Sequence, residues 1–229
     1  DLCSKRNNKK FIFISTCSNY GLIDNNELAD ENFVLQPLSL YAKSKVNAED
    51  YILSLINKTD MKPTILRFAT AFGLSPRMRF DLTVSEFTRE LVLDNKLLVY
   101  DANTWRPYCH VRDFARLIQL VIEAPVEKVS FEVFNAGGDI NNATKQTIVD
   151  TILERVHNGK VKYQKHGSDP RNYRVNFNKV RSVLGFEPKY TIQNGVEELV
   201  DAMQNHIFDY VDDNRNFYGN NEFNYPIPL

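Results

Sequence analysis

Two short segments carry side chains that could move a proton. Residues 10–21 form an apolar run that ends in hydroxyls, which predicts a buried strand with Thr16 at its end. Residues 41–45 read Tyr-Ala-Lys-Ser-Lys, and on a helix this spacing places the phenol of Tyr41 and the ammonium of Lys45 on one face. A lysine lowers the pKa of a nearby phenol, and a hydroxyl can orient a substrate. Together the three residues predict proton removal from a sugar or alcohol hydroxyl.

The elements that position these residues alternate between strand and helix along the chain. Ser39 is a typical helix cap, and Pro63 stands at the start of an apolar run, where a missing donor is harmless. Asp113 is expected to cap a further helix. The pattern predicts helices over residues 40–56, 82–93, 114–123 and 145–156, and strands over residues 63–68, 96–100 and 131–136. This alternation favours an α/β fold, a doubly wound parallel sheet with a smaller interleaved lobe.

Composition limits the classes of function. The 229 residues carry a net charge of −1, 43% hydrophobic residues and no apolar run of membrane-spanning length, so nothing indicates nucleic acid or a membrane as a partner. The cysteines Cys3, Cys17 and Cys109 are too few and too scattered for a disulfide framework or a thiolate metal site, and the histidines show no ligand spacing. The sequence therefore predicts a metal-free protein of the reducing cytoplasm.

The strand-end hydroxyl and the Tyr-x-x-x-Lys helix together resemble the extended short-chain dehydrogenase/reductase family, the sugar-nucleotide epimerases and dehydratases. The resemblance implies that Thr16, Tyr41 and Lys45 are catalytic and that the cofactor is NAD or NADP. It places Tyr41, Lys45 and Ala69 against the cofactor and makes a nucleotide-diphosphate sugar the substrate. In this view Tyr41 is the general base and acid on the sugar 4-hydroxyl.

The resemblance also implies a set of substrate contacts. Residues 67–73 resemble the family segment Arg-x-x-Asn-x-Tyr/Phe-Gly, with Thr70 standing where asparagine is usual, so that one shorter hydroxyl replaces an amide. Arg106 and Arg171 fall on positions that contact the substrate diphosphate, as two guanidinium groups suit bidentate phosphate binding. Asn135, at the end of the strand before Gly137, is expected near the substrate. Residues 177–185 and 195–203 resemble the closing helices of the family.

The two residues after Thr16 separate subclasses of the family. In 4,6-dehydratases these positions resemble an Asp-Glu pair that eliminates water, whereas here they are Cys17 and Ser18. This disfavours such a dehydratase and favours 4-epimerisation. Reduction of a 4-keto sugar uses the same three catalytic residues and stays open, as does a 3,5-epimerase that uses Cys17. A catalytically incomplete fragment that serves as a binding or dimerisation subunit is the alternative from another class.

The chain contains no Gly-x-x-Gly-x-x-Gly turn to receive a dinucleotide pyrophosphate. We therefore expect the C-terminal two-thirds of a Rossmann-like sheet, in a fragment that alone binds the cofactor poorly. Residues 1–72 would be the remnant of the dinucleotide-binding domain. Residues 73–229 would be mainly the substrate lobe, with some segments returning to the sheet and an extended tail over 208–229. The helix over 40–56 carries extra apolar residues, Tyr51 and Leu55 among them, which predicts a homodimer through this helix.

Overall fold

The computed structural model describes residues 10–23 and 27–208. Its main sheet has three parallel strands in the order β1-β3-β7: β1 (Lys10–Thr16), β3 (Lys62–Phe68) and β7 (Glu132–Ala136). The register pairs Thr16 with Phe68 and Phe68 with Ala136, so the carboxyl ends of the three strands meet at one edge. The predicted α/β fold with parallel strands is confirmed.

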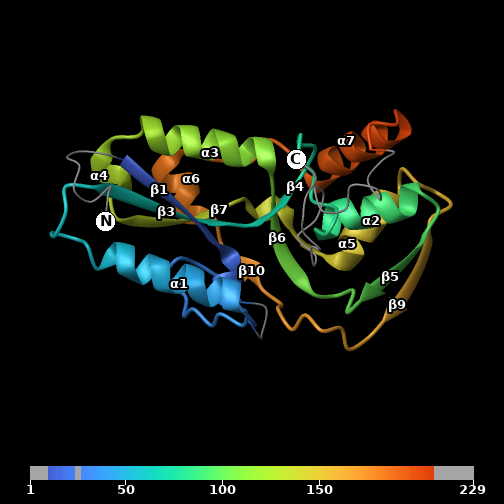
Figure 1. The fold of residues 1–229 in the computed structure, drawn as a ribbon, viewed down its shortest axis with the longest axis horizontal. Helices are drawn as coiled ribbons and strands as arrows, with labels where there is room; N and C mark the ends of the chain where they lie inside the picture. Colours follow the sequence, from blue (N-terminus) through green and yellow to red (C-terminus); the bar gives the residue numbers. More distant parts are fainter. Residues whose placement is uncertain (1–9, 24–26, 209–229) are drawn as a thin grey trace, which may run out of the picture.

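Helices cover both faces of this sheet (Figure 1). α1 (Leu40–Leu53) lies on one side, while α3 (Val111–Glu123) and α6 (Asn178–Leu184) lie on the other, with the short α4 (Val126–Val129) near the start of β3. Parallel sheets need such cover because both of their faces are apolar.

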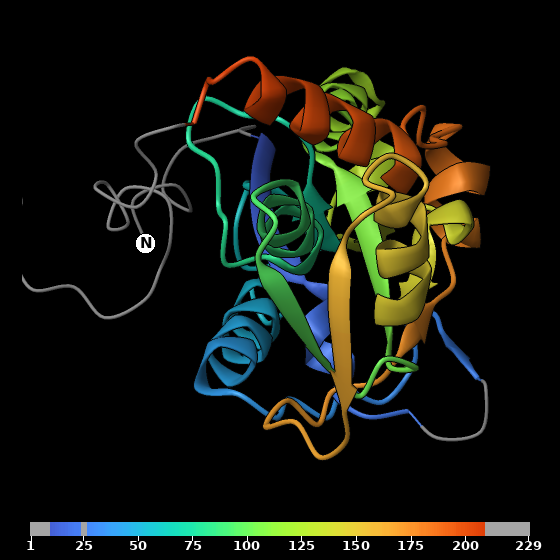
Figure 2. The same cartoon turned by 90° about the vertical axis from the view of Figure 1, so that its right-hand side faces the viewer.

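A second group of elements stands beyond the carboxyl edge of the sheet. Figure 2 faces this group, in which β5 (Lys96–Tyr100) pairs in parallel with β9 (Lys160–Gln164) and lies beside three helices. The helices are α2 (Thr83–Val92), α5 (Lys145–Leu153) and α7 (Ile192–Gln204). A mixed sheet of β4 (Thr70–Phe72), β6 (Trp105–His110) and β8 (Asn142–Thr144) connects the two groups, and β2 (Leu28–Ala29) pairs with β10 (Arg174–Val175).

Two hydrophobic clusters correspond to the two groups of elements. One contains Leu66, Leu117 and Phe134 between the main sheet and α3, and the other contains Leu91 and residues of α5 and α7. Chain segments after residue 72 contribute to both clusters, since α3 and β7 return to the main sheet. We propose that the boundary between a sheet domain and a substrate lobe lies near residue 72, as the sequence suggested.

Local capping explains where several helices begin. The Ser39 hydroxyl accepts a hydrogen bond from the backbone N–H of Ala42 at the start of α1, as predicted. Thr191 and Asn194 form a reciprocal capping box at the start of α7. α1 ends at Leu53 and α5 at Leu153, three residues earlier than the apolar periodicity indicated in each case.

The role predicted for Asp113 is wrong. α3 begins at Val111, three residues before the predicted start at 114, and His110 is the residue that caps it. Asp113 is fully buried, and its carboxylate accepts the backbone N–H groups of Lys189 and Tyr190 and a hydrogen bond from Arg116. The carboxylate therefore joins α3 to the chain that leads into α7.

Residues 105–110 form a strand that the sequence did not predict, because their polar and aromatic side chains show no clear alternation of apolar and polar residues.

The tail expected over 208–229 lies outside the described residues except for Phe208, whose ring packs edge-on against Phe80. Among residues 10–23 and 27–208, no helix combines the length and the apolar character needed to cross a bilayer.

Candidate active site

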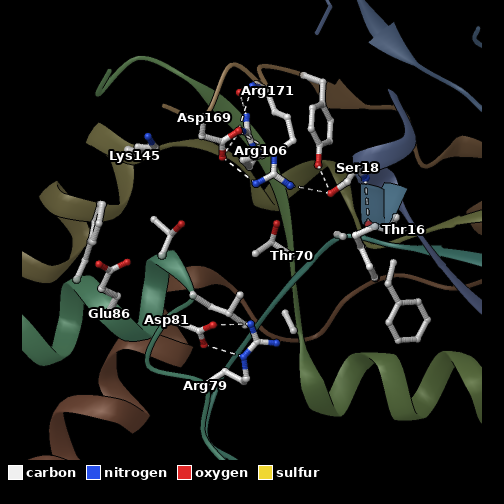
Figure 3. Close-up of a pocket in the computed structure, with 18 of the residues that line it drawn as sticks. Thr16, Ser18, Thr70, Arg79, Asp81, Glu86, Arg106, Lys145, Asp169 and Arg171 are labelled. Atoms are coloured by element: carbon white, nitrogen blue, oxygen red, sulfur yellow. Dashed lines mark hydrogen bonds and ion pairs between the residues drawn. The ribbon is translucent and has the colours of Figure 1, made fainter. Parts of the chain in front are cut away.

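A cavity of about 960 Å³ opens at the carboxyl edge of the main sheet, between the two groups of elements (Figure 3). Carboxyl ends of parallel strands are where open α/β sheets bind ligands. Six of the predicted site residues line it: Thr16, Tyr41, Ala69, Thr70, Arg106 and Arg171. Lys45 and Asn135 are not among the lining residues.

Thr16 ends β1 and faces the cavity with its hydroxyl group held in place. Its oxygen accepts the backbone N–H of Ser18 at 3.1 Å, where the chain turns into a short 3-10 helix over Cys17–Tyr20. Because the oxygen is the acceptor in this bond, the hydroxyl hydrogen remains available to donate to a ligand.

Tyr41 and Lys45 lie one turn apart near the start of α1. The ring of Tyr41 is 56% exposed and lines the cavity, and the Lys45 ammonium is 5.7 Å from the centre of that ring. Lys45 donates to the carbonyl oxygen of Ile14 at 2.8 Å and lies over the Phe13 ring. One of its three donors is thus used by β1, and two are left.

A buried network fixes α1 to the sheet and so positions these residues. Glu49, two turns after Tyr41, forms an ion pair with Arg67 of β3 and accepts a hydrogen bond from Ser15 of β1. Both charged side chains are almost completely buried. α1 can therefore not slide along the sheet without breaking an ion pair in a medium of low dielectric constant.

Asn135 belongs to the same network and not to the cavity wall. It is fully buried, its side-chain oxygen accepts from the Tyr20 hydroxyl at 2.7 Å, and its amide group donates to the carbonyl oxygens of Ala29 and Asn176. The Tyr20 hydroxyl also accepts from Arg67. The side chain of Asn135 is thus occupied by protein partners in this structure.

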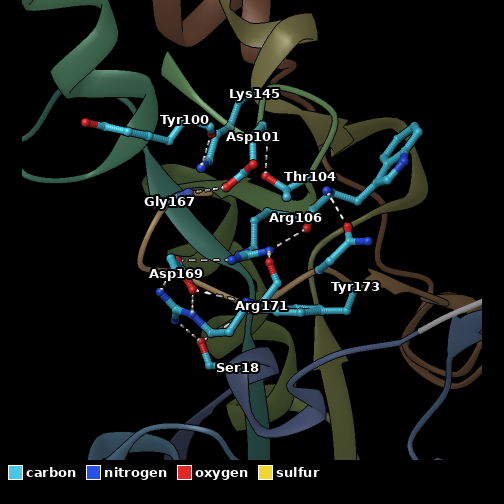
Figure 4. A network of polar contacts seen from close by, with 12 residues as sticks. Ser18, Tyr100, Asp101, Thr104, Arg106, Lys145, Gly167, Asp169, Arg171 and Tyr173 are labelled. Atoms are coloured by element: carbon cyan, nitrogen blue, oxygen red, sulfur yellow. Dashed lines mark hydrogen bonds and ion pairs between the residues drawn. The ribbon is translucent and has the colours of Figure 1, made fainter. Parts of the chain in front are cut away.

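The two predicted arginines also line the cavity and lie close together (Figure 4). Arg106 comes from β6, and Arg171 comes from the loop between β9 and β10. Both contact the carboxylate of Asp169: Arg171 through Nε and Nη2, each at 2.8 Å, and Arg106 through Nη2 at 3.1 Å. Partial burial alone would raise the pKa of Asp169, but the hydrogen bonds from Arg171 and the charge of Arg106 outweigh it and hold this pKa well below its usual range.

Further charged side chains line the cavity, among them an ion pair and a lysine. Arg79 and Asp81 form a bidentate ion pair on the chain before α2, with Nε–Oδ1 and Nη2–Oδ2 distances of 2.7 and 2.6 Å. Lys145, at the start of α5, donates to the carbonyl oxygen of Tyr100. Burial and the charge of Arg106 lower the pKa of Lys145.

The residues after Thr16 provide no strong acid or base. Cys17 is fully buried, its thiol donates to the carbonyl oxygen of Arg67, and burial raises its pKa far above the usual range. The Ser18 hydroxyl accepts from Arg171 Nη1 at 3.1 Å and lies 3.4 Å from the Tyr173 hydroxyl. Both side chains are engaged in structural contacts.

Sequence reasoning did not identify Arg79, Asp81, Lys145 or Asp169 as residues of the site. The short spacings Asp169 to Arg171 and Arg79 to Asp81 were visible in the sequence, and each favours an ion pair across a turn. The convergence of Asp169 on Arg106 was not visible, because 63 residues separate them.

Comparisons with known proteins show the family of this chain. The profile of the NAD dependent epimerase/dehydratase family matches residues 1–137. UDP-glucuronate 4-epimerase from Thermodesulfobacterium geofontis is 25% identical, over 87% of this chain and 60% of that protein. The structure of dTDP-glucose 4,6-dehydratase from Bacillus anthracis, in complex with NAD, is 26% identical with a TM-score of 0.75, over 87% of this chain and 63% of that one.

UDP-glucose 4-epimerase from Thermotoga maritima, solved with UDP-glucose, is 25% identical with a TM-score of 0.76, over 87% of this chain and 64% of that one. The chain therefore spans about three fifths of the length of these relatives. The resemblance to the extended short-chain dehydrogenase/reductase family is confirmed. Because the matched residues 1–137 make up more than half of the 229 residues, the chain belongs to the NAD dependent epimerase/dehydratase family.

Proposed function

We propose that the full-length protein is a nucleotide-sugar 4-epimerase that uses NAD or NADP. One observation carries this proposal: a single cavity is lined by Thr16 and Tyr41 and also by the two arginines. A nucleotide-diphosphate sugar needs both kinds of group, because it carries an oxidisable sugar hydroxyl and two phosphate charges. A UDP-sugar fits this description, and two of the related proteins above act on UDP-sugars by name.

In this proposal Tyr41 takes the proton from the sugar 4-hydroxyl and later returns it. The Lys45 ammonium favours the phenolate by its charge, since an opposite charge nearby stabilises the ionised form. Thr16 donates its free hydrogen to the reacting oxygen, because its own oxygen already accepts from Ser18. Thr70 lies in the middle of the cavity (Figure 3) and offers a hydroxyl to the sugar.

Arg106 and Arg171 neutralise the diphosphate and anchor the substrate while the sugar turns. Epimerisation requires that both faces of the oxidised sugar reach the same acid and hydride donor. A firm hold on the diphosphate together with few side-chain contacts to the sugar allows this rotation. The short Thr70 hydroxyl stands where the family segment that residues 67–73 resemble has an asparagine, and it is compatible with this rotation.

The part of the cavity beside Tyr41 fits a nicotinamide. Ser15, Thr16 and Ala69 line the cavity beside Tyr41 at the carboxyl edge, and Lys45 retains two donors that could reach a ribose hydroxyl. A nicotinamide bound there supplies the chemistry of accepting and returning a hydride at the sugar carbon. Tyr41, Lys45 and Ala69 are the residues that would hold it.

Elimination of water is a weaker candidate because the cavity has no carboxylate next to Thr16. Cys17 is buried and its raised pKa keeps the thiol neutral, and Ser18 is engaged with Arg171. Neither group can exchange a proton with the sugar C5 or C6 at neutral pH. The same observation argues against a 3,5-epimerase that uses Cys17.

The decisive experiment incubates the full-length protein with UDP-glucose or UDP-glucuronate and catalytic NAD, and follows the products by NMR. A 4-epimerase gives the C4 epimer with no net change in reduced cofactor. Consumption of stoichiometric NADH or NADPH by a 4-keto sugar would identify a reductase instead, and a 4-keto-6-deoxy product would identify a dehydratase.

We further propose a cytoplasmic homodimer that associates through α1.

A further inference from the structure

Asp169 uses the same faces of the two arginines that a diphosphate needs. The fork formed by Nε and Nη2 of Arg171 is filled by the two carboxylate oxygens, and Arg106 Nη2 reaches the same carboxylate (Figure 4). Fork-to-fork contact is also how arginine binds phosphate most strongly. The carboxylate thus stands where the ligand anion would have to stand.

Some of the remaining guanidinium donors are used by other partners. Arg171 Nη1 donates to the Ser18 hydroxyl, and Arg106 Nη1 donates to the backbone oxygens of Trp105 and Arg171. A guanidinium has five N–H groups in a fixed plane, and these contacts together with those to Asp169 engage three of the five in each arginine. A diphosphate can use the Nε–Nη2 fork of Arg171 only if the Asp169 carboxylate leaves it.

Charge favours such an exchange over simultaneous binding. Two arginines and one carboxylate leave a net charge of +1, and hydrogen bonds from Arg171 help to keep the carboxylate ionised at neutral pH. A diphosphate beside the ionised Asp169 would meet a like charge at hydrogen-bond distance, which is costly in a partly buried site. With the carboxylate displaced, two positive charges face two negative ones.

The loop around Asp169 is anchored on both sides of this residue. The Asp101 carboxylate accepts the backbone N–H groups of His166 and Gly167, at 2.9 and 2.6 Å. At the other end, the Asn172 side-chain oxygen accepts the backbone N–H of Trp105, and the Asn172 backbone exchanges hydrogen bonds with Gly21 and Ile23. Residues 168 and 170, on either side of Asp169, are exposed, so this side chain can swing out while both anchors hold.

We propose that Asp169 is an internal substitute for the ligand anion: it occupies the arginine pair in the free protein and is exchanged for phosphate oxygens when a diphosphate binds. The backbone oxygen of Arg171 stays on Arg106 during the exchange, which keeps both guanidinium groups in place. The inference takes the diphosphate from the proposed function. It adds that binding is a competition within the protein, so that Asp169 limits affinity and ensures rejection of weakly charged ligands.

The test compares the full-length parent with Asp169→Asn for binding of inorganic pyrophosphate by calorimetry at constant ionic strength. We expect the variant to bind at least about tenfold more tightly, because hydrogen bonds to a charged group no longer have to be broken. Asp201→Asn is the matched control, since this carboxylate is exposed and pairs with Arg155 away from the cavity; its affinity should equal that of the parent. Equal or weaker binding by Asp169→Asn, or no binding by either protein, would overturn the proposal.

Hydrogen exchange of the parent provides a second measurement that does not depend on the variant folding. The Arg171 backbone N–H donates to the Asp169 carboxylate at 3.2 Å, so its exchange should become faster when pyrophosphate binds. Slower or unchanged exchange at this amide would show that the carboxylate stays in place, against the proposal. Failure of the epimerase assignment would look different. The protein would then not convert UDP-sugars, while Asp169→Asn would still bind pyrophosphate more tightly than the parent.

Discussion

The Glu49 carboxylate and the Arg67 guanidinium form an ion pair of 2.7 Å that is buried between α1 and β3, with side chains only 1% and 5% exposed. Arg67 also donates to the Tyr20 hydroxyl and to the backbone oxygen of Glu31. The pair thus connects the helix that carries Tyr41 to the strand that leads into Ala69. Its geometry controls where Tyr41 stands relative to the cavity.

Glu49→Gln should destabilise the protein by about 3–5 kcal/mol, the cost of leaving a buried charge without its partner. Urea unfolding measures this effect. Asp94→Asn is the control, because Asp94 and its partner Lys160 are both exposed and such pairs contribute within about 1 kcal/mol. Similar losses in the two variants would contradict a dominant role for the buried pair.

Tyr41→Phe in the full-length protein should lower turnover by about 10²–10⁴-fold, the usual contribution of a positioned acid or base. Binding of the nucleotide sugar should change little, because the arginines that hold the diphosphate are untouched. Tyr51→Phe on the same helix is the matched control, since Tyr51 does not line the cavity. An active Tyr41→Phe enzyme would remove Tyr41 from the mechanism.

Replacing Arg106 or Arg171 by Ala should weaken binding of UDP by about 1.5–3 kcal/mol, the range for hydrogen bonds to charged groups. Equilibrium titration measures it, with Arg155→Ala as control because Arg155 is outside the cavity lining and pairs with the exposed carboxylate of Asp201. If both arginine variants bind UDP as tightly as the parent, the diphosphate lies elsewhere.

The two buried thiols should resist alkylation at pH 8 in the folded state. Burial raises the pKa values of Cys17 and Cys109, and the neutral thiol is a poor nucleophile. In a Cys3→Ser background, iodoacetamide should therefore label these two sites only after unfolding, as mass spectrometry would report.

The same pKa shift sets a direction for stability against pH. The thiols ionise near pH 8.5 in the unfolded chain but only at higher pH in the folded one. Their contribution to the free energy of unfolding is therefore complete below about pH 8.5, and this contribution is lost as the pH rises above that value. Cys17→Ala should reduce this alkaline slope of the unfolding free energy, and an unchanged slope would contradict the assignment.

The proposed dimer is tested by placing a charge on α1. Leu55, just after the helix, is partly buried, and Tyr51 is 53% exposed. Leu55→Glu should convert a dimer to a monomer in sedimentation at micromolar concentration, because a buried charge opposes association. A parent that sediments as a monomer would refute the proposal.

The sequence by itself determined the fold class and several of the residues that line the cavity. Strand and helix periodicities are local properties, so the parallel strands at 63–68 and 131–136 and the helix after Ser39 could be predicted. The Tyr41 to Lys45 spacing and the hydroxyl at the end of β1 followed from the same local rules. Arg106 and Arg171 were found only by resemblance.

Tertiary structure alone decided which partners these groups have. Lys45 donates to Ile14, Asn135 is enclosed by Tyr20 and backbone oxygens, and Asp113 binds the start of a distant segment instead of capping its own helix. Asp169 meets Arg106 across 63 residues. The residue type sets how many hydrogen bonds a side chain can make. Which partners it has depends on the distances between groups in space, and those distances are set by how separate elements pack.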